Sequence, residues 1–129
     1  MSTLRTSGAA ALAALTTIGT LLVSAGPAHA DITVDSAICL QNATGALTSS
    51  NPVVAAPGHP TFEWTASLPY TQCAQSNGHL YLVDNGVATL LPANSGNGVE
   101  GGPGRHLLIL RVKTSLGQRD LSSVTLTTV

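Results

Sequence analysis

Residues 61–67 read TFEWTAS, and this stretch decides the fold class. Phe62, Trp64 and Ala66 alternate with polar residues, among them Glu63. A period of two with one apolar face is typical of a strand in an antiparallel sheet that is buried on one side. The stretch therefore predicts a half-buried strand with Phe62 and Trp64 in the core.

Stronger strand patterns follow on the C-terminal side. HLYLVD (79–84) and VATLL (87–91) flank Asn85-Gly86, the residue pair that a two-residue hairpin turn favours because both positions need a positive φ. HLLILRVKT (106–114) is the longest apolar strand pattern, and LSSVTLTTV (121–129) predicts a closing strand beside it.

The N-terminal side has weaker patterns. ITVDSAICL (32–40) predicts the first strand, and a short one is expected around 53–55. Two polar loops are expected at 68–78 and 92–104, the second too rich in Gly and Asn to pack and therefore exposed. Turn residues recur about every ten positions and helix formers are sparse, so the chain predicts an all-β sandwich of about seven strands.

The first thirty residues have the order of a helical secretory signal peptide. Arg5 precedes an apolar run over 9–23, which is shorter than the about 20 residues that a membrane span needs. Ala28-His29-Ala30 supplies small residues at positions −3 and −1, so cleavage is expected between Ala30 and Asp31. An uncleaved anchor is the alternative. Because Asp31 is not cysteine, no lipid anchor is expected at this site.

Cleavage would leave residues 31–129 as one domain of 99 residues, secreted to the extracellular space. That part carries four basic and six acidic residues and no basic cluster, which excludes nucleic acid and an anionic membrane as expected partners.

Cys39 and Cys73 are the two cysteines of the chain. An even number in an exported protein predicts a disulfide, because the compartment is oxidising. A disulfide between them would close a loop of 34 residues and would stabilise the fold by about 3–4 kcal/mol. A free or metal-binding pair is the alternative.

Three stretches resemble bacterial immunoglobulin-like and PKD-like domains. The Trp-bearing strand 61–67 is similar to their early core strand, 101–112 to a Pro-Gly turn leading into the penultimate strand, and 124–129 to the terminal strand. The resemblance implies a single immunoglobulin-like antiparallel β-sandwich, but it carries no functional residue across, because these folds host unrelated activities. The chain departs from it in two ways: the Trp-Asp-Phe-Gly-Asp-Gly stretch is absent, and Trp64 does not lie midway between two bridged cysteines.

The inventory of reactive residues argues against catalysis. His59, His79 and His106 each stand at the start of a predicted strand, lack the spacing of a ligand set, and are expected to be exposed. No Gly-x-Ser-x-Gly motif is present. Glu63 and Asp84 lie on strands that could be neighbours and could form a glycosidase pair, but outward-facing solubilising charges are the preferred interpretation. We therefore expect no enzyme activity, no metal and no cofactor.

The sequence instead favours a small secreted, non-catalytic binding or interaction module, monomeric, with an unidentified extracellular protein or carbohydrate as partner. Its expected working surface is the two loops 68–78 and 92–104, with candidate contact residues Tyr70, Tyr81, Asn94 and Asn97. A secreted hydrolase inhibitor acting through 68–78 and a self-associating surface or matrix component are the alternatives. The Ala-rich leader favours a bacterial source, so the sequon at Asn42 is expected to stay unmodified.

Overall fold

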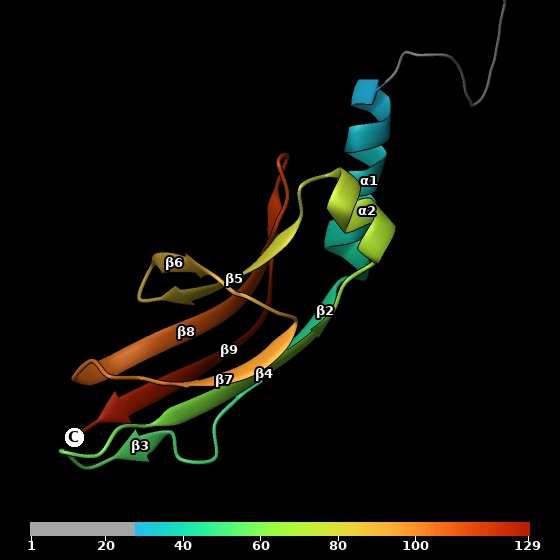
Figure 1. Ribbon diagram of the computed structural model, residues 1–129. Coiled ribbons are helices and arrows are strands. Elements are labelled where there is room, and N and C mark those ends of the chain that lie inside the picture. The colour runs from blue at the N-terminus through green and yellow to red at the C-terminus, as the bar shows by residue number, and fades with distance from the viewer. Residues whose placement is uncertain (1–27) are drawn as a thin grey trace, which may run out of the picture. The chain divides into compact units, whose positions relative to one another are not determined.

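A computed structural model describes residues 28–129, with side chains from residue 32 onward (Figure 1). The chain divides into two units, Met1–Val34 and Asp35–Val129. The described part of the first unit is the beginning of helix α1 (Ala28–Asn42). Most of the predicted signal peptide lies outside the described residues, and its cleavage site falls in the first turns of α1, so cleavage stays a prediction.

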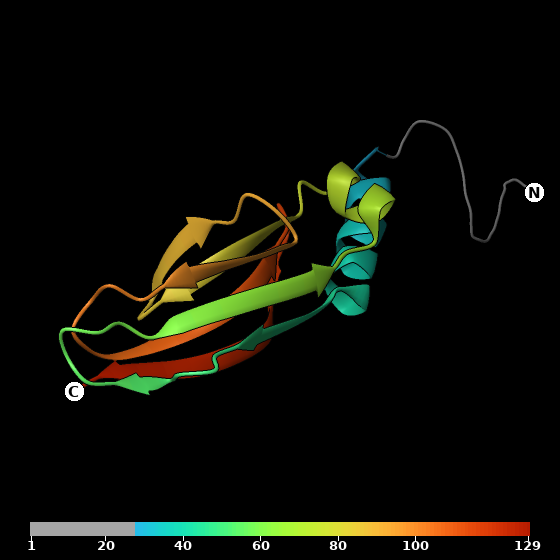
Figure 2. The ribbon, with the colours of Figure 1, turned by 60° about the horizontal axis from the view of Figure 1, so that its bottom comes forward.

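The second unit is mostly β, with two sheets (Figures 1 and 2). The smaller sheet is antiparallel with the order β2-β4-β7, formed by β2 (Thr44–Thr48), β4 (Thr61–Ser67) and β7 (Ser95–Val99). The larger has the order β3-β9-β8-β5-β6, formed by β3 (Val53–Val54), β9 (Gln118–Thr128), β8 (Gly104–Lys113), β5 (His79–Asp84) and β6 (Val87–Leu90). All its pairs are antiparallel except β3 with β9.

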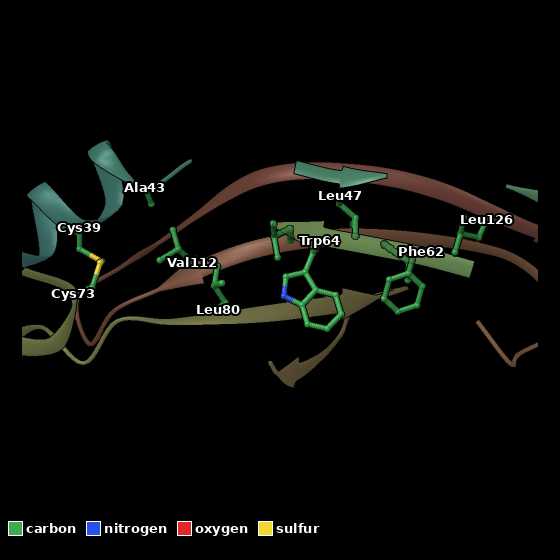
Figure 3. Close-up of a cluster of buried hydrophobic side chains, with 11 residues drawn as sticks. Cys39, Ala43, Leu47, Phe62, Trp64, Cys73, Leu80, Val112 and Leu126 are labelled. Atoms are coloured by element: carbon green, nitrogen blue, oxygen red, sulfur yellow. A yellow bond between two sulfur atoms is a disulfide. The ribbon is translucent and has the colours of Figure 1, made fainter. Parts of the chain in front are cut away.

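The core lies between the two sheets, as an all-β sandwich requires (Figure 3). Leu47, Phe62 and Trp64 come from the smaller sheet, and the larger sheet supplies aliphatic side chains, namely Leu80, Leu108, Leu110, Val112 and Leu126. The predicted strand over 61–67 is confirmed, and both of its aromatic side chains are buried.

The hairpin is confirmed as well. Asn85 and Gly86 have φ values of 46° and 91°, and they join β5 to β6 in an antiparallel register. Strand β8 (Gly104–Lys113) lies on the predicted 106–114 stretch and begins earlier, and β9 pairs with it except at Leu121, where the register shifts.

The prediction of a strand over 32–40 is wrong, because those residues belong to α1. Ser36 and Cys39 are buried and Leu40 packs against the core, and this spacing of three and four residues is that of one helix face. Ala43, which follows α1 and donates its N–H to the carbonyl oxygen of Cys39, continues that buried face. At the start of the segment, Ile32 and Val34 alternate with Thr33 as in a strand, and this pattern favoured the strand prediction over the helical spacing.

The prediction of a loop over 68–78 is also wrong in part, because helix α2 (Tyr70–Gln75) occupies the centre of that segment. The predicted disulfide joins the two helices: Cys39 of α1 is bonded to Cys73 of α2, with their Cα atoms 4.9 Å apart. Both cysteines are buried, and Gly78 lies against them so closely that a Cβ at this position would come within 2.8 Å of Cys39 Sγ.

The prediction that 92–104 is an exposed loop unable to pack is wrong in part. Its residues Ser95–Val99 form β7, which pairs with β4. The inward positions are Gly96 and Gly98, and a Cβ there would lie 2.5 Å from the Trp64 ring and 2.6 Å from the Phe62 ring. The two aromatic side chains fill the space that side chains of β7 would otherwise occupy, which is why this strand has no apolar pattern of its own.

Candidate functional site

Three ionisable side chains from three different elements meet at one end of the sandwich. Asp84 ends β5, Glu100 follows β7, and His106 lies near the start of β8. Asp84 pairs in register with Leu108, and His106 lies two residues before Leu108 on the same face of β8. On β5 and β8, Asp84 and His106 therefore continue the inward face beyond the inward apolar residues of those two strands. We call Asp84, Glu100 and His106 the acid–histidine cluster.

The imidazole of His106 lies at the centre of this cluster. Its Nδ1 is 2.7 Å from Asp84 Oδ1 and 3.5 Å from Glu100 Oε2. On the other side of the ring, Nε2 donates a hydrogen bond to the carbonyl oxygen of Pro103 at 3.0 Å. The ring is thus fixed in orientation, with Nδ1 directed at the two carboxyl groups.

Glu100 is the buried member of the cluster, with 9% of its side chain exposed. Its Oε2 accepts a hydrogen bond from the backbone N–H of Gly102 at 3.1 Å. The backbone at Gly102 lies directly against the site, since a Cβ there would be 2.8 Å from the imidazole and 3.2 Å from Glu100 Oε2. A side chain at position 102 would therefore disturb both groups.

The hairpin turn holds the other side of the site. The side chain of Asn85 accepts a hydrogen bond from the backbone N–H of Leu107 at 2.8 Å and donates one to the carbonyl oxygen of Arg105 at 3.1 Å. These bonds tie the β5–β6 turn to the start of β8, and so they fix the distance between Asp84 and His106.

The environment shifts two pKa values upward. Burial, followed by a hydrogen bond with Asp84, raises the pKa of Glu100 above its ordinary value. The hydrogen bond with Asp84 raises the pKa of His106, with the Pro103 carbonyl and the charge of Glu100 acting in the same direction. The leading causes differ: burial disfavours the charged carboxylate of Glu100, whereas the neighbouring acceptor Asp84 favours the charged imidazolium of His106.

The arrangement does not fit the glycosidase pair considered from the sequence. Glu63 is exposed on β4, in the smaller sheet, whereas Asp84 lies in the larger sheet, so the idea that their strands are neighbours is wrong. The carboxyl group near Asp84 is that of Glu100, and an oxygen of each lies within 4.8 Å of the other. Glycosidase carboxyl groups stand about 5 Å or more apart to leave room for substrate or water, so this pair does not fit either geometry.

The four candidate contact residues do not form one surface. Tyr70 lies on α2 with 85% of its surface exposed, and Asn94 is exposed just before β7. Tyr81 alternates with the inward Leu80 and Leu82 on β5, so it faces outward from the larger sheet. Asn97 alternates with the inward glycines of β7 and faces outward from the smaller sheet.

The histidines separate into two kinds. His59 and His79 are exposed, as expected, but the expectation of an exposed His106 is wrong, since 16% of its side chain is exposed. Sequence reasoning compared the histidines only with one another, whereas the partners of His106 are carboxyl groups from other elements. One pattern could have indicated Asp84: it directly precedes the hairpin turn, and it lies in the inward phase of β5, as His106 does near the start of β8, the strand that pairs with β5.

Comparison with known proteins found no family model, no curated protein and no solved structure that matches this chain. Among the helices of residues 28–129, none has the length and apolar character that a membrane crossing requires.

Proposed function

We propose that this chain is a small secreted, non-catalytic binding module with an immunoglobulin-like fold. It binds its extracellular partner at the end of the sandwich that contains the acid–histidine cluster, the Asn85-Gly86 turn and the segment 100–104. One observation carries the proposal: three elements bring one buried and two half-buried ionisable side chains together there, and hydrogen bonds between side chains and backbone hold the surrounding turn and segment in place. Polar groups fixed on a rigid scaffold are typical of recognition sites.

The strand order supports the immunoglobulin-like part. If β2, β4 and β7 are the A, B and E strands, then β5, β6, β8 and β9 take the places of C, C′, F and G. Strand β3 beside β9 then corresponds to a first strand that crosses to the second sheet. The bridge departs from this scheme, because it joins two helices rather than B to F. The disulfide is consistent with an extracellular protein.

Secretion has a direct test. The full chain, expressed in an exporting host, should be recovered from the medium with Asp31 at its N-terminus and without free thiols. Intact mass and N-terminal sequencing check both points. A product that retains residues 1–30 would contradict the secreted form of the proposal.

The binding surface can be mapped with defined probes. Isotope-labelled protein is titrated with soluble peptidoglycan fragments, chitin and cellulose oligosaccharides, and purified secreted proteases, while amide resonances are followed. We expect shifts to concentrate at residues 84–87 and 100–106, without turnover of the probe. Shifts at 70–75 with inhibition of a protease would favour the inhibitor instead, although α2 leaves no extended loop there to enter an active site.

Self-association is the second candidate, and one feature favours it. All four residues of β6 are exposed and uncharged, and β6 is an edge strand of the larger sheet. Such an edge can pair with a second copy unless a charge protects it. If this candidate is correct, sedimentation velocity will show concentration-dependent dimers that Thr89→Lys abolishes. A monomer at all concentrations would exclude it.

A further inference from the structure

We propose that the acid–histidine cluster is a binding site for one divalent transition-metal ion, with Asp84, Glu100 and His106 as its protein ligands. The inference rests on the proposed function for its setting, because it names a ligand class at the end of the sandwich where binding is proposed.

The donor atoms are already close to the spacing that such an ion requires. The Nδ1 of His106, one oxygen of Asp84 and one of Glu100 all lie within 4.8 Å of one another. Bonds of about 2.0–2.2 Å to a tetrahedral zinc ion place neighbouring ligand atoms roughly 3.3–3.6 Å apart. The distance from His106 to Glu100 is 3.5 Å, so that pair needs no change. Asp84, at 2.7 Å, would withdraw by somewhat more than half an ångström.

The hydrogen bond to Pro103 determines the tautomer of His106. The carbonyl oxygen of Pro103 can only accept, so Nε2 must carry the hydrogen of that bond. In the neutral ring Nδ1 then carries a lone pair, and it faces two carboxyl groups that also offer lone pairs, while the amide nitrogen of Asn85, at 3.5 Å, is a distant donor. Three acceptors that converge on one point require a cation or additional protons between them. A ring N–H donated to a backbone carbonyl is also the usual support of a metal-binding histidine.

The burial of Glu100 distinguishes the acid–histidine cluster from a group of exposed acidic side chains. Glu100 has 9% of its side chain exposed, and the backbone N–H of Gly102 holds its Oε2 toward the imidazole. The close approach at Gly102 leaves room for the ligands but not for a Cβ. The entropy cost of gathering the ligands is therefore largely met by folding itself, which favours binding.

The ligand set selects the class of ion. Imidazole with two carboxylates suits Zn²⁺ and its first-row neighbours, and the two negative charges balance the ion. Calcium needs 6–8 oxygen ligands, more than this cluster supplies. Asp84 has 34% of its side chain exposed, so the coordination sphere is open to solvent on that side. A water molecule or a group of a partner can complete it there.

The test uses the exported protein with its disulfide intact, freed of metal by a chelator, and titrated with zinc chloride in a calorimeter. We expect one Zn²⁺ per chain, no comparable heat with calcium, and a Co²⁺ form whose visible spectrum reports nitrogen and oxygen coordination. His106→Gln and Glu100→Gln should each weaken binding at least about tenfold. The matched controls His59→Gln and Glu63→Gln, at exposed positions, should bind as the parent does.

A pair of glycine variants keeps the test valid if a ligand variant folds poorly. Gly102→Ala removes no ligand but places a Cβ against the cluster, whereas Gly101→Ala meets nothing within 4 Å. Loss of zinc affinity in the first and not in the second supports the site. Absence of stoichiometric zinc binding in the parent protein, or equal binding in His106→Gln and His59→Gln, overturns it.

This inference and the proposed function can fail separately. If zinc does not bind but probe shifts still map to 84–87 and 100–106, the metal site is wrong and the binding end stands. If zinc binds and no probe shifts that end, the metal site stands and the binding surface is wrong.

Discussion

The two ends of the sandwich are closed in opposite ways. At one end the Cys39–Cys73 disulfide joins α1 to α2, buried beside Gly78. At the other end, reached roughly 17 Å along β5, Asp84 and His106 meet beside Gly102. In both places a glycine allows the backbone to lie directly against the closing group.

The difference between the ends is in what can loosen them. A buried covalent bond keeps its strength when protons or cations are added, and it responds only to reduction. A cluster of carboxyl groups and imidazole changes its charge in the physiological pH range. A small domain, which buries too little surface for a wide margin of stability, therefore has one end that is permanent and one whose stability depends on its surroundings.

Removing the disulfide should have the largest effect. The Cys39→Ala/Cys73→Ala variant should lose about 3–4 kcal/mol of unfolding free energy, because the bridge no longer restricts a loop of 34 residues in the unfolded chain. Urea unfolding followed by tryptophan fluorescence measures this. The parent protein after reduction should show the same loss, and a loss below about 1 kcal/mol would mean that packing alone closes this end.

Gly78→Ala should weaken the same end without breaking the bond. The new Cβ would lie 2.8 Å from Cys39 Sγ and 3.1 Å from a backbone oxygen, and neither atom can move freely. We expect a loss of about 1–3 kcal/mol, the usual cost of overpacking, with thiol titration still showing an intact bridge. An unchanged melting temperature would show that the disulfide end adjusts more easily than its packing indicates.

Gly102→Ala tests the other end by the same substitution. The atoms it would meet belong to side chains of the cluster and not to a covalent bridge, so we expect a smaller loss of about 1 kcal/mol. Gly101→Ala is the control, since its Cβ would meet open space. Equal losses in the two variants would place the effect in the backbone of the segment rather than in the cluster.

The dependence of stability on pH should be the smallest effect and the most specific to the cluster end. His106 and Glu100 both have raised pKa values when folded. Their contributions are complete below the ordinary values of 6.5 and 4.5, and they are lost as the pH rises through the raised ones. With a chelator present, stability should therefore fall from mildly acidic to mildly alkaline pH by less than about 1 kcal/mol, the upper end for a solvent-accessible ion pair.

His106→Gln should flatten this profile over the range in which histidine titrates. Asp120→Asn is the control: it removes the exposed ion pair that Arg111 makes at 2.6 Å, and it should leave the slope unchanged. Melting temperatures between pH 5 and pH 8 would decide this. A melting temperature of the parent protein that rises with pH in this range would contradict the description of the cluster.

Sequence reasoning succeeded where the pattern is local. The alternation at Phe62 and Trp64, the Asn85-Gly86 turn and the apolar face of β8 each depend on neighbours within a few residues. It was wrong at 32–40, where the helical spacing of Ser36, Cys39 and Ala43 competed with a strand-like start. It missed β2, a strand of five residues with a single buried side chain, Leu47.

The cluster escaped prediction for a different reason. Glu100 stands in a glycine-rich segment that has no periodicity, and its burial depends on β7 pairing with β4. That pairing in turn depends on the two aromatic rings that lie over Gly96 and Gly98. A glycine carries no information about what fills the space beside it, so the position of Glu100 follows only from contacts between distant segments.

The amino-acid sequence by itself therefore determined the β class, the hairpin, the aromatic core strand and the cysteine pair, because each is set by short-range periodicity or by the composition of the chain. Only the tertiary structure decided that both cysteines lie on helices, that the glycine-rich segment contains a strand, and that Asp84, Glu100 and His106 meet. Each of these depends on side chains that are far apart in sequence and become neighbours only when the two sheets pack.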